Sequence, residues 1–133
     1  MKKKSLYENL QKEVRSMKMP EIEVWQNMYK DKDYCITMDV PEFTCICPKT
    51  GLPDFAVITI QYRPQEYCIE LKSFKMYIND YRNIGIFHEH VVNRILEDLV
   101  NACKPRWMSV SGVFNLRGGI KTSVSAEYKK GKK

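Results

Sequence analysis

The 133-residue chain is 44% hydrophobic and 29% charged, ordinary values for a soluble globular protein of one domain. No apolar run approaches the roughly 18 residues of a membrane span, and no apolar segment follows the basic N-terminus as in a signal peptide. The net charge of +6 suits nucleic acid or a phosphorylated ligand, and part of it comes from lysines at both ends. We expect a cytoplasmic, single-domain protein over residues 1–133, with an N-terminal extension (1–20) and a basic tail (129–133).

The cysteines indicate a reducing environment. The chain contains five of them: Cys35, Cys45, Cys47, Cys68 and Cys103. An odd number without a secretion signal argues against a disulfide framework, and no pair has the spacing of a zinc knuckle. We therefore expect reduced thiols and no metal site.

The N-terminal part of the chain is expected to contain one helix and two strands. Apolar residues at helical spacing predict a short amphipathic helix over residues 5–18, which Pro20 ends. Residues 21–28 and 34–40 are predicted to be strands joined by a polar turn, because apolar and polar residues alternate clearly in the second.

A loop and two more strands are expected next. Residues 43–54 contain two prolines and a glycine, which argue against a regular helix or a central strand. β-branched and aromatic residues then predict a strand over residues 55–62. After a turn, residues 67–71 are expected to return beside that strand.

The second half of the chain is expected to hold two helices and a hairpin. A helix is predicted over residues 73–81 with Ser73 as its N-cap, and an apolar stripe predicts another over 89–103. Alternating residues predict strands over 108–116 and 120–128, joined by a glycine turn.

This order of elements predicts an α+β fold in which two helices cover one face of an antiparallel sheet. A single sheet of this kind leaves its edge strands open, and open edges must be paired or covered. Assembly of several chains into a closed barrel would satisfy this requirement.

The loop over residues 43–54 is the first candidate for chemistry. Cys47 and Asp54 lie seven positions apart, and such a loop could hold their thiol and carboxyl side by side. A thiolate is a strong nucleophile once its pKa is lowered, which partial exposure near Lys49 would favour. The alternatives are a structural buried cysteine and turn chemistry for Asp54, and Cys45 could equally be the reactive thiol.

Three downstream segments could bind a charged ligand. Lys72 and Lys75 lie three apart at the start of a helix, where free N–H groups could also hold phosphate. Arg117, before two glycines, is a second phosphate candidate, and His88 and Glu89 begin the next helix. A solvated basic face, a plain hairpin turn and a glutamate favoured by the helix dipole are the respective alternatives.

Six motifs follow one another along most of the chain, from about Glu42 to Ile120. They are Cys47-Pro48-Lys49-Thr50-Gly51, Pro53-Asp54-Phe55, Glu70-Leu71-Lys72-Ser73-Phe74-Lys75-Met76-Tyr77, Arg82-Asn83, Phe87-His88-Glu89 and Arg117-Gly118-Gly119-Ile120. Together they resemble the NADPH-dependent 7-cyano-7-deazaguanine reductases, the nitrile reductases of queuosine biosynthesis, in their short single-module form.

The resemblance implies a tunnelling fold (T-fold), in which the subunits of a homo-oligomer assemble their sheets into a barrel with active sites at subunit boundaries. It implies that Cys47, rather than Cys45, is the catalytic nucleophile, and that Asp54 is the proton donor. His90-Val91 occupies a place where some relatives carry another cysteine, so a disulfide with Cys47 through that position is not possible; Cys45 and Cys68 are the alternative partners. The implied partners are the small molecule 7-cyano-7-deazaguanine and further copies of the chain, without membrane or direct nucleic-acid binding.

The other motif residues are implied to bind the ligands. Those for the substrate are Ile69, Glu70, Leu71, His88 and Glu89. Those for the phosphates of the cofactor NADPH are Lys72, Lys75 and Arg117. Carboxylate acceptors suit the N–H edge of a deazaguanine, and a buried Glu89 would discriminate against bases that lack those donors.

The implied reaction starts with addition of the Cys47 thiolate to the nitrile carbon while Asp54 protonates the nitrogen, which gives a covalent thioimide. Two hydrides from NADPH then lead to 7-aminomethyl-7-deazaguanine. An archaeosine-type amidinotransferase of the same fold and a non-enzymatic RNA-binding module are the alternatives. The intact Lys72 and Lys75 argue against the first, which needs no NADPH, and the missing aromatic RNA-binding pattern argues against the second.

Overall fold

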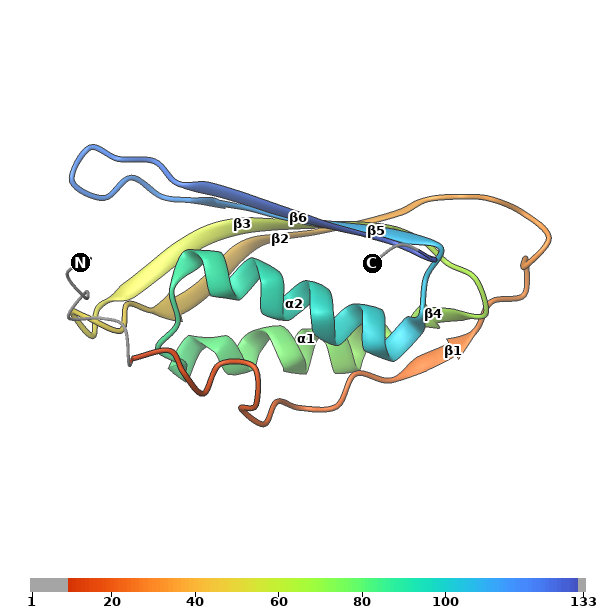
Figure 1. Cartoon of the computed structure of the whole chain (residues 1–133), viewed down its shortest axis with the longest axis horizontal. Helices are drawn as coiled ribbons and strands as arrows, with labels where there is room; N and C mark the ends of the chain where they lie inside the picture. The colour runs from red at the N-terminus through yellow and green to blue at the C-terminus, as the bar shows by residue number, and fades with distance from the viewer. Residues whose placement is uncertain (1–9, 132–133) are drawn as a thin grey trace, which may run out of the picture.

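The computed structural model describes residues 10–131, which form a sheet layer and a helix layer (Figure 1). In chain order the elements are β1 (Val24–Gln26), β2 (Ile36–Ile46), β3 (Pro53–Arg63), β4 (Tyr67–Ile69), α1 (Leu71–Asp80), the 3-10 helix η1 (Tyr81–Asn83), α2 (His88–Cys103), β5 (Trp107–Phe114) and β6 (Ser123–Lys129). The predicted α+β class, with two helices on one face of an antiparallel sheet, is confirmed.

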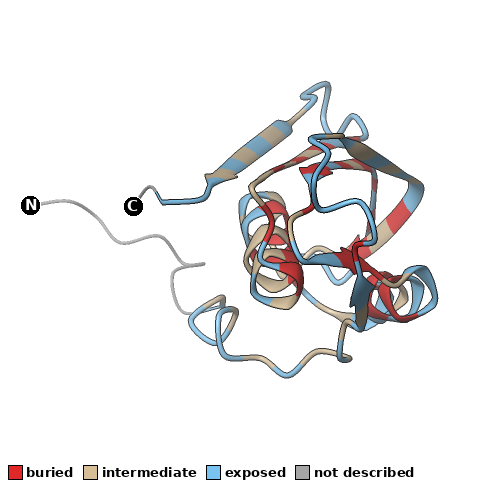
Figure 2. Ribbon diagram, turned by 90° about the vertical axis from the view of Figure 1, so that its right-hand side faces the viewer, coloured by how far each residue is buried: buried red, intermediate tan, exposed pale blue. Residues whose placement is uncertain are grey.

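The main sheet has the strand order β2-β3-β5-β6, and each neighbouring pair is antiparallel. Alternate residues of β3 are buried: Asp54, Ala56, Ile58, Ile60 and Tyr62. Figure 2 shows the buried positions of the described chain in red. The intervening side chains, such as Phe55 and Val57, are exposed on the opposite face. One face of the sheet therefore carries the core, and the other is uncovered in a single chain.

Helix α2 supplies most of the helical side of the core. Its predicted stripe is buried against β5 and β6, with Val91, Val92, Ile95, Leu99 and Cys103 fully covered. The helix approaches β5 closely at Gly112, where an added Cβ would lie 3.0 Å from the side chains of both Val92 and Ile58. Glycine at this position allows the two layers to pack at the observed distance. Among residues 10–131, no helix is long and apolar enough to cross a membrane.

Two short strands pair differently from the prediction. β1 and β4 pair with each other in a separate two-stranded sheet, and each is only three residues long. The expected hairpin between residues 21–28 and 34–40 is therefore wrong, as is the return of residues 67–71 beside β3. The physical reason is that β2 and β5 occupy both sides of β3 and leave no edge for β4.

β2 is longer than the predicted strand over 34–40. It continues through Pro41 to Ile46, with a shift of register between Val40 and Phe43. A proline is tolerated there because β2 is an edge strand with a bulge. The loop predicted over residues 43–54 is consequently confined to residues 47–52, and Pro53 is the first residue of β3, where a missing N–H is tolerated.

The predicted helix over residues 5–18 is wrong in its described part. Residues 10–16 form turns, and residues 5–9 lie outside the described part of the chain. The carbonyls of Val14 and Met17 accept hydrogen bonds from Arg94 of α2. The turns keep two backbone hydrogen bonds of their own, Val14 to Gln11 and Ser16 to Glu13, and the contacts with Arg94 hold the segment against α2.

Candidate active site

The loop between β2 and β3 holds Cys47 in a tight turn. The Cys47 N–H donates to the Leu52 carbonyl at 2.8 Å, and the Gly51 N–H donates to the Cys47 carbonyl at 2.9 Å. Gly51 has φ of +73°, in the left-handed region that glycine adopts without strain. This turn places Cys47 partly exposed at the end of β2.

The Cys47 thiol is arranged to ionise readily, because its pKa lies below the ordinary value. The largest cause is a hydrogen bond from the Thr50 hydroxyl, and the backbone N–H groups of Thr50 and Lys49 act in the same direction. Burial and the charge of Asp54 oppose them. Donors aimed at the sulfur stabilise the thiolate, which is the nucleophilic form. Thr50 had no role in the sequence prediction, although it stands in the same motif.

Cys45 has the opposite environment. It lies on β2 with no exposed surface, opposite Asp54 of β3, and its sulfur is 3.9 Å from the Ile86 carbonyl. Burial raises the pKa of the Cys45 thiol to about 12. Of the two candidate thiols, only Cys47 combines accessibility with a lowered pKa.

Asp54 is buried and its two carboxylate oxygens have different partners. Oδ1 is 2.5 Å from a guanidinium nitrogen of Arg117, and Oδ2 is 3.2 Å from Nε2 of His88. The His88 ring stacks on Phe114, with centroids 3.8 Å apart and an interplanar angle of 9°. Residues from β3, from the start of α2 and from the β5–β6 connection therefore converge on this carboxylate. The stacking role of Phe114 had no signal in the sequence beyond its place in a strand.

Glu89 lies in the first turn of α2, next to His88. Its side chain is exposed in the single chain, so the expectation of a buried Glu89 is wrong for this chain alone. The first turns of α2 direct Val91 and Val92 into the core, which leaves Glu89 facing outward.

The other predicted substrate residues lie at the far end of the molecule. Ile69 is buried, and its N–H donates to the Tyr62 hydroxyl at 3.0 Å. Tyr62 follows Asp54 by eight residues on β3, which corresponds to about 26 Å along a strand. Figure 1 shows that the two helices begin at opposite ends of the molecule: α1 starts beside β4, and α2 starts at the end where the β2–β3 loop lies. One chain therefore brings together Cys47, Asp54, His88, Glu89 and Arg117, but not the residues at the start of α1.

Helix α1 begins at Leu71 with Glu70 as its N-cap, so the prediction of Ser73 as N-cap is wrong. The Glu70 carboxylate accepts from the N–H groups of Lys72 and Ser73, each at 2.7 Å. These bonds, led by that from Ser73, hold the pKa of Glu70 below its ordinary value. The expected phosphate contact of free N–H groups in this turn is not supported, because Glu70 already occupies two of them.

The three predicted cofactor residues are also divided. Lys72 and Lys75 are exposed on the first turns of α1, whereas Arg117 lies beside Asp54 and also donates to the Pro53 carbonyl. Exposed amines fit the phosphates of a dinucleotide. Among the described residues, no three His, Cys, Asp or Glu side chains gather closely enough to hold a metal ion.

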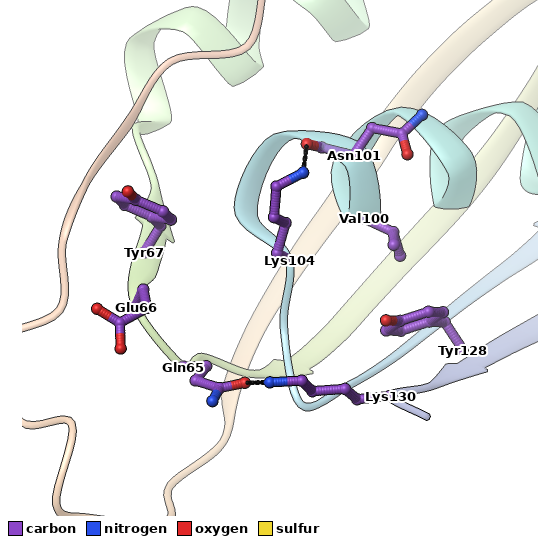
Figure 3. A pocket seen from close by; sticks show the side chains of 8 residues that line it. All are labelled: Gln65, Glu66, Tyr67, Val100, Asn101, Lys104, Tyr128 and Lys130. Carbon is purple, nitrogen blue, oxygen red and sulfur yellow. Dashed lines mark hydrogen bonds between the residues drawn. The ribbon is translucent and has the colours of Figure 1, made fainter. Parts of the chain in front are cut away.

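A cavity of about 520 Å³ lies between the C-terminal end of α2, residues 65–67 and the end of β6 (Figure 3). Its lining includes Lys104, Tyr128 and Lys130, and none of the predicted site residues. The cavity therefore gives no separate support to the predicted site.

The fold and the cluster around Cys47 and Asp54 define an α+β enzyme domain. Its cysteine has a lowered pKa, and the nearby buried aspartate contacts both Arg117 and His88. Residues 53–133 match the family described as QueF-like protein, and the chain belongs to this family. A solved structure, the archaeosine synthase QueF-Like in the apo form, shares the fold with a TM-score of 0.65 over 70% of this chain and 91% of that one, at 22% identity.

Two curated relatives have higher sequence identity. The protein from Elusimicrobium minutum is 54% identical over 113 residues, which cover 85% of each chain. The protein from Chlorobaculum tepidum is 56% identical over 111 residues, which cover 84% of this chain and 95% of the relative. Both relatives are named NADPH-dependent 7-cyano-7-deazaguanine reductase.

Proposed function

We propose that this chain is an NADPH-dependent reductase that converts the nitrile of 7-cyano-7-deazaguanine to an aminomethyl group in queuosine biosynthesis. Support comes from family membership and from relatives at 52–56% identity that share this activity in their names. The observation that carries the chemistry is the accessible Cys47 thiol with a lowered pKa, close to the buried Asp54. Free thiols at all five cysteines suit a reducing cytoplasm, where we place the reaction.

The first step uses Cys47 and Asp54. The Cys47 thiol gives its proton to the Asp54 carboxylate, and the resulting thiolate forms a bond to the nitrile carbon. One electron pair of the carbon–nitrogen triple bond then takes that proton from Asp54 on nitrogen. The product is a thioimide that holds the substrate on the enzyme. Contacts to Arg117 and His88 fix the carboxyl group, so the proton is delivered from one defined position.

Two NADPH molecules, bound one after the other, would each supply one of the two hydrides that complete the conversion of nitrile to amine. We assign Lys72, Lys75 and Arg117 to the phosphates of NADPH. We assign Ile69, Glu70, Leu71, His88 and Glu89 to the substrate. The exposed amines of Lys72 and Lys75 and the guanidinium of Arg117 are positively charged and can pair with negatively charged phosphates. The exposed Glu89 carboxylate can accept hydrogen bonds from the N–H edge of the base.

We further propose that the active site is completed between subunits of a homo-oligomer. The assigned residues lie at the two ends of one chain, about 26 Å apart along β3, so one chain cannot place them around one substrate. β2 and β6 are open edges of the main sheet, and its uncovered face exposes Phe55, Val57 and Val113. Head-to-tail pairing of these edges would close the sheets into a barrel and bring opposite ends of neighbouring chains together.

The function is tested by mixing the protein with 7-cyano-7-deazaguanine and NADPH and following nicotinamide absorbance. We expect about two NADPH to be consumed per substrate, since two hydrides convert a nitrile to an amine. A Cys47→Ala variant is expected to be inactive, with Cys45→Ala as the matched control that retains activity. Absence of turnover by the unmodified protein, together with specific binding of tRNA, would contradict the proposal.

A further inference from the structure

Gln11 joins the N-terminal segment to the chain that leads into α2. Its Oε1 accepts from the Phe87 N–H at 3.0 Å and lies 2.8 Å from Nδ1 of His90, while its Nε2 donates to the Gly85 carbonyl at 3.2 Å. An amide oxygen only accepts, so the contact with His90 requires the imidazole proton on Nδ1. One side chain thus holds three points on both sides of His88.

Helix α2 needs a partner at this end. Its N-cap is Phe87, which has no polar side chain with which to cap the helix. The first N–H groups of a helix have no acceptor within the helix itself. The Gln11 amide, 76 positions upstream, supplies one for Phe87.

The same stretch of chain is fixed on its other side by β2. The Ile86 N–H donates to the Ile46 carbonyl at 3.0 Å, and the Ile46 N–H donates to the Ile84 carbonyl at 2.9 Å. Ile46 directly precedes Cys47. Residues 84–88 therefore lie between Gln11 and the end of β2, the strand that leads into the Cys47 turn.

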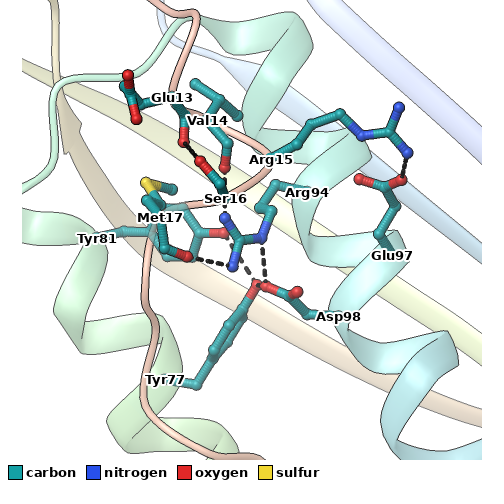
Figure 4. A network of polar contacts seen from close by, with 10 residues as sticks. All are labelled: Glu13, Val14, Arg15, Ser16, Met17, Tyr77, Tyr81, Arg94, Glu97 and Asp98. Carbon is teal, nitrogen blue, oxygen red and sulfur yellow. Dashed lines mark hydrogen bonds and ion pairs between the residues drawn. The ribbon is translucent and has the colours of Figure 1, made fainter.

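Gln11 itself belongs to an anchored segment. The buried Arg94 donates to the carbonyls of Val14 and Met17, and its Nε is 2.9 Å from Asp98 (Figure 4). Asp98 also accepts from the Tyr77 hydroxyl at 2.5 Å. This network connects residues 14–17 to both helices. The backbone three residues after Gln11 is therefore held in place.

We infer that Gln11 is a positioning residue, which sets the location of the substrate-binding pair His88 and Glu89 relative to Cys47. The inference rests on the proposed function, because that function assigns the substrate to these two residues. Gln11 makes its contacts next to the pair, and it acts through the backbone and His90. Its loss is expected to loosen the start of α2 while leaving the Cys47 turn unchanged.

The test compares three variants in steady-state assays and in adduct formation without NADPH. Gln11→Met keeps the length of the side chain and removes both the acceptor and the donor, so the contacts with Phe87, His90 and Gly85 are lost. We expect the KM for the nitrile to rise about tenfold, the scale of one net hydrogen bond. Gln11→Glu keeps an acceptor oxygen and is expected to restore most of the loss. Arg15→Ala, on the same segment, removes only an exposed ion pair with Glu97 and should match the unmodified protein.

Iodoacetamide labelling of Cys47 should be equal in all variants, because Thr50 still sets the thiolate. A Gln11→Met protein with a lower melting temperature but an unchanged KM and adduct rate would overturn the inference. Hydrogen exchange of the Phe87 N–H can be measured on the unmodified protein alone. Slow exchange of this N–H supports the inference, and exchange at the rate of an unfolded chain overturns it. If the unmodified protein neither turns over nor forms an adduct, the proposed function fails, whereas the Phe87 exchange still reports on Gln11.

Discussion

At the scale of residues, two cysteines two positions apart differ because their surroundings differ. Cys45 is buried in the sheet–helix core, where a charged sulfur is disfavoured and its pKa rises to about 12. Cys47 lies in a turn that directs a hydroxyl and two backbone N–H groups toward its sulfur. The sequence leaves the choice between the two cysteines open. The burial of Cys45 and the hydrogen bonds to Cys47 exist only once the chain has folded and residues 47–52 form the turn between β2 and β3.

The Thr50 hydroxyl is the largest cause of the lowered pKa of Cys47, which gives a direct prediction. Replacing it with Thr50→Val should raise the pKa of the Cys47 thiol, because a donor to the thiolate is lost. The pH at which alkylation of Cys47 reaches half its maximal rate should move upward, and labelling at neutral pH should slow. Thr50→Ser keeps the hydroxyl and serves as the control. An unchanged pH profile in Thr50→Val would contradict the assigned cause.

At the scale of elements, the sequence predicted the individual helices and strands better than it predicted which strands pair. The helix predicted from the apolar stripe over residues 89–103 and the strand predicted from the β-branched and aromatic residues 55–62 were both confirmed, as α2 and β3. Strand pairing was harder, because the pairing of β4 with β1 depends on β3 having no free edge. The cap of α1 was also missed, since a glutamate at position 70 is a less usual N-cap than Ser73.

The close approach of α2 to β5 predicts that Gly112→Ala is destabilising. The new Cβ would lie 3.0 Å from Ile58 and Val92, both in the core, so neighbouring groups must shift. Overpacking of this kind costs about 1–3 kcal/mol in the free energy of unfolding. Gly85→Ala is the matched control, because its Cβ would meet only ordinary contacts at 3.7 Å and beyond. Urea unfolding measures the stability of both variants. Equal unfolding midpoints for Gly112→Ala and Gly85→Ala would contradict the prediction, because they would show that α2 and β5 can move apart without loss of stability.

The N-cap role of Glu70 predicts a pH-dependent contribution to stability. Its pKa is lowered in the folded chain, so the contribution is present above the unfolded pKa and is lost as the pH falls through the folded pKa. Glu70→Ala should therefore unfold at lower urea than the unmodified protein near pH 7, and the difference should shrink in acid. Glu66→Ala, which removes an exposed carboxylate paired with Lys30, is the control. A difference that stays constant with pH would contradict the cap.

At the scale of the whole molecule, the motif residues were predicted one by one, but their division between two ends of the chain was not. The order of the motifs in the sequence does not reveal this division. Asp54 and Tyr62 lie at opposite ends of the same strand, β3, and the site residues near each of them are therefore far apart. The start of α1 and the start of α2 also point to opposite ends, since the two helices run in opposite directions (Figure 1). The proposed site, with residues at both ends, would therefore need a second chain to complete it.

Subunit complementation tests this division. Cys47→Ala removes one half of the site, and the double variant Lys72→Ala/Lys75→Ala removes the other. When the two inactive proteins are mixed and reassembled, about a quarter of the shared sites should contain both intact halves and activity should return. Mixing Cys47→Ala with Asp54→Ala, whose changes lie at the same end, should restore nothing. Equal failure of both mixtures would place the complete site within one chain.

The central claim is that Cys47 forms a covalent bond to the nitrile carbon. Intact-mass and peptide-mapping spectrometry of the unmodified protein with 7-cyano-7-deazaguanine, without NADPH, tests it most directly. We predict a mass gain of one substrate molecule per chain, located on Cys47 and absent from Cys45, that disappears when NADPH is added. Normal turnover without an adduct on Cys47, or an adduct that persists in Cys47→Ala, would contradict this account.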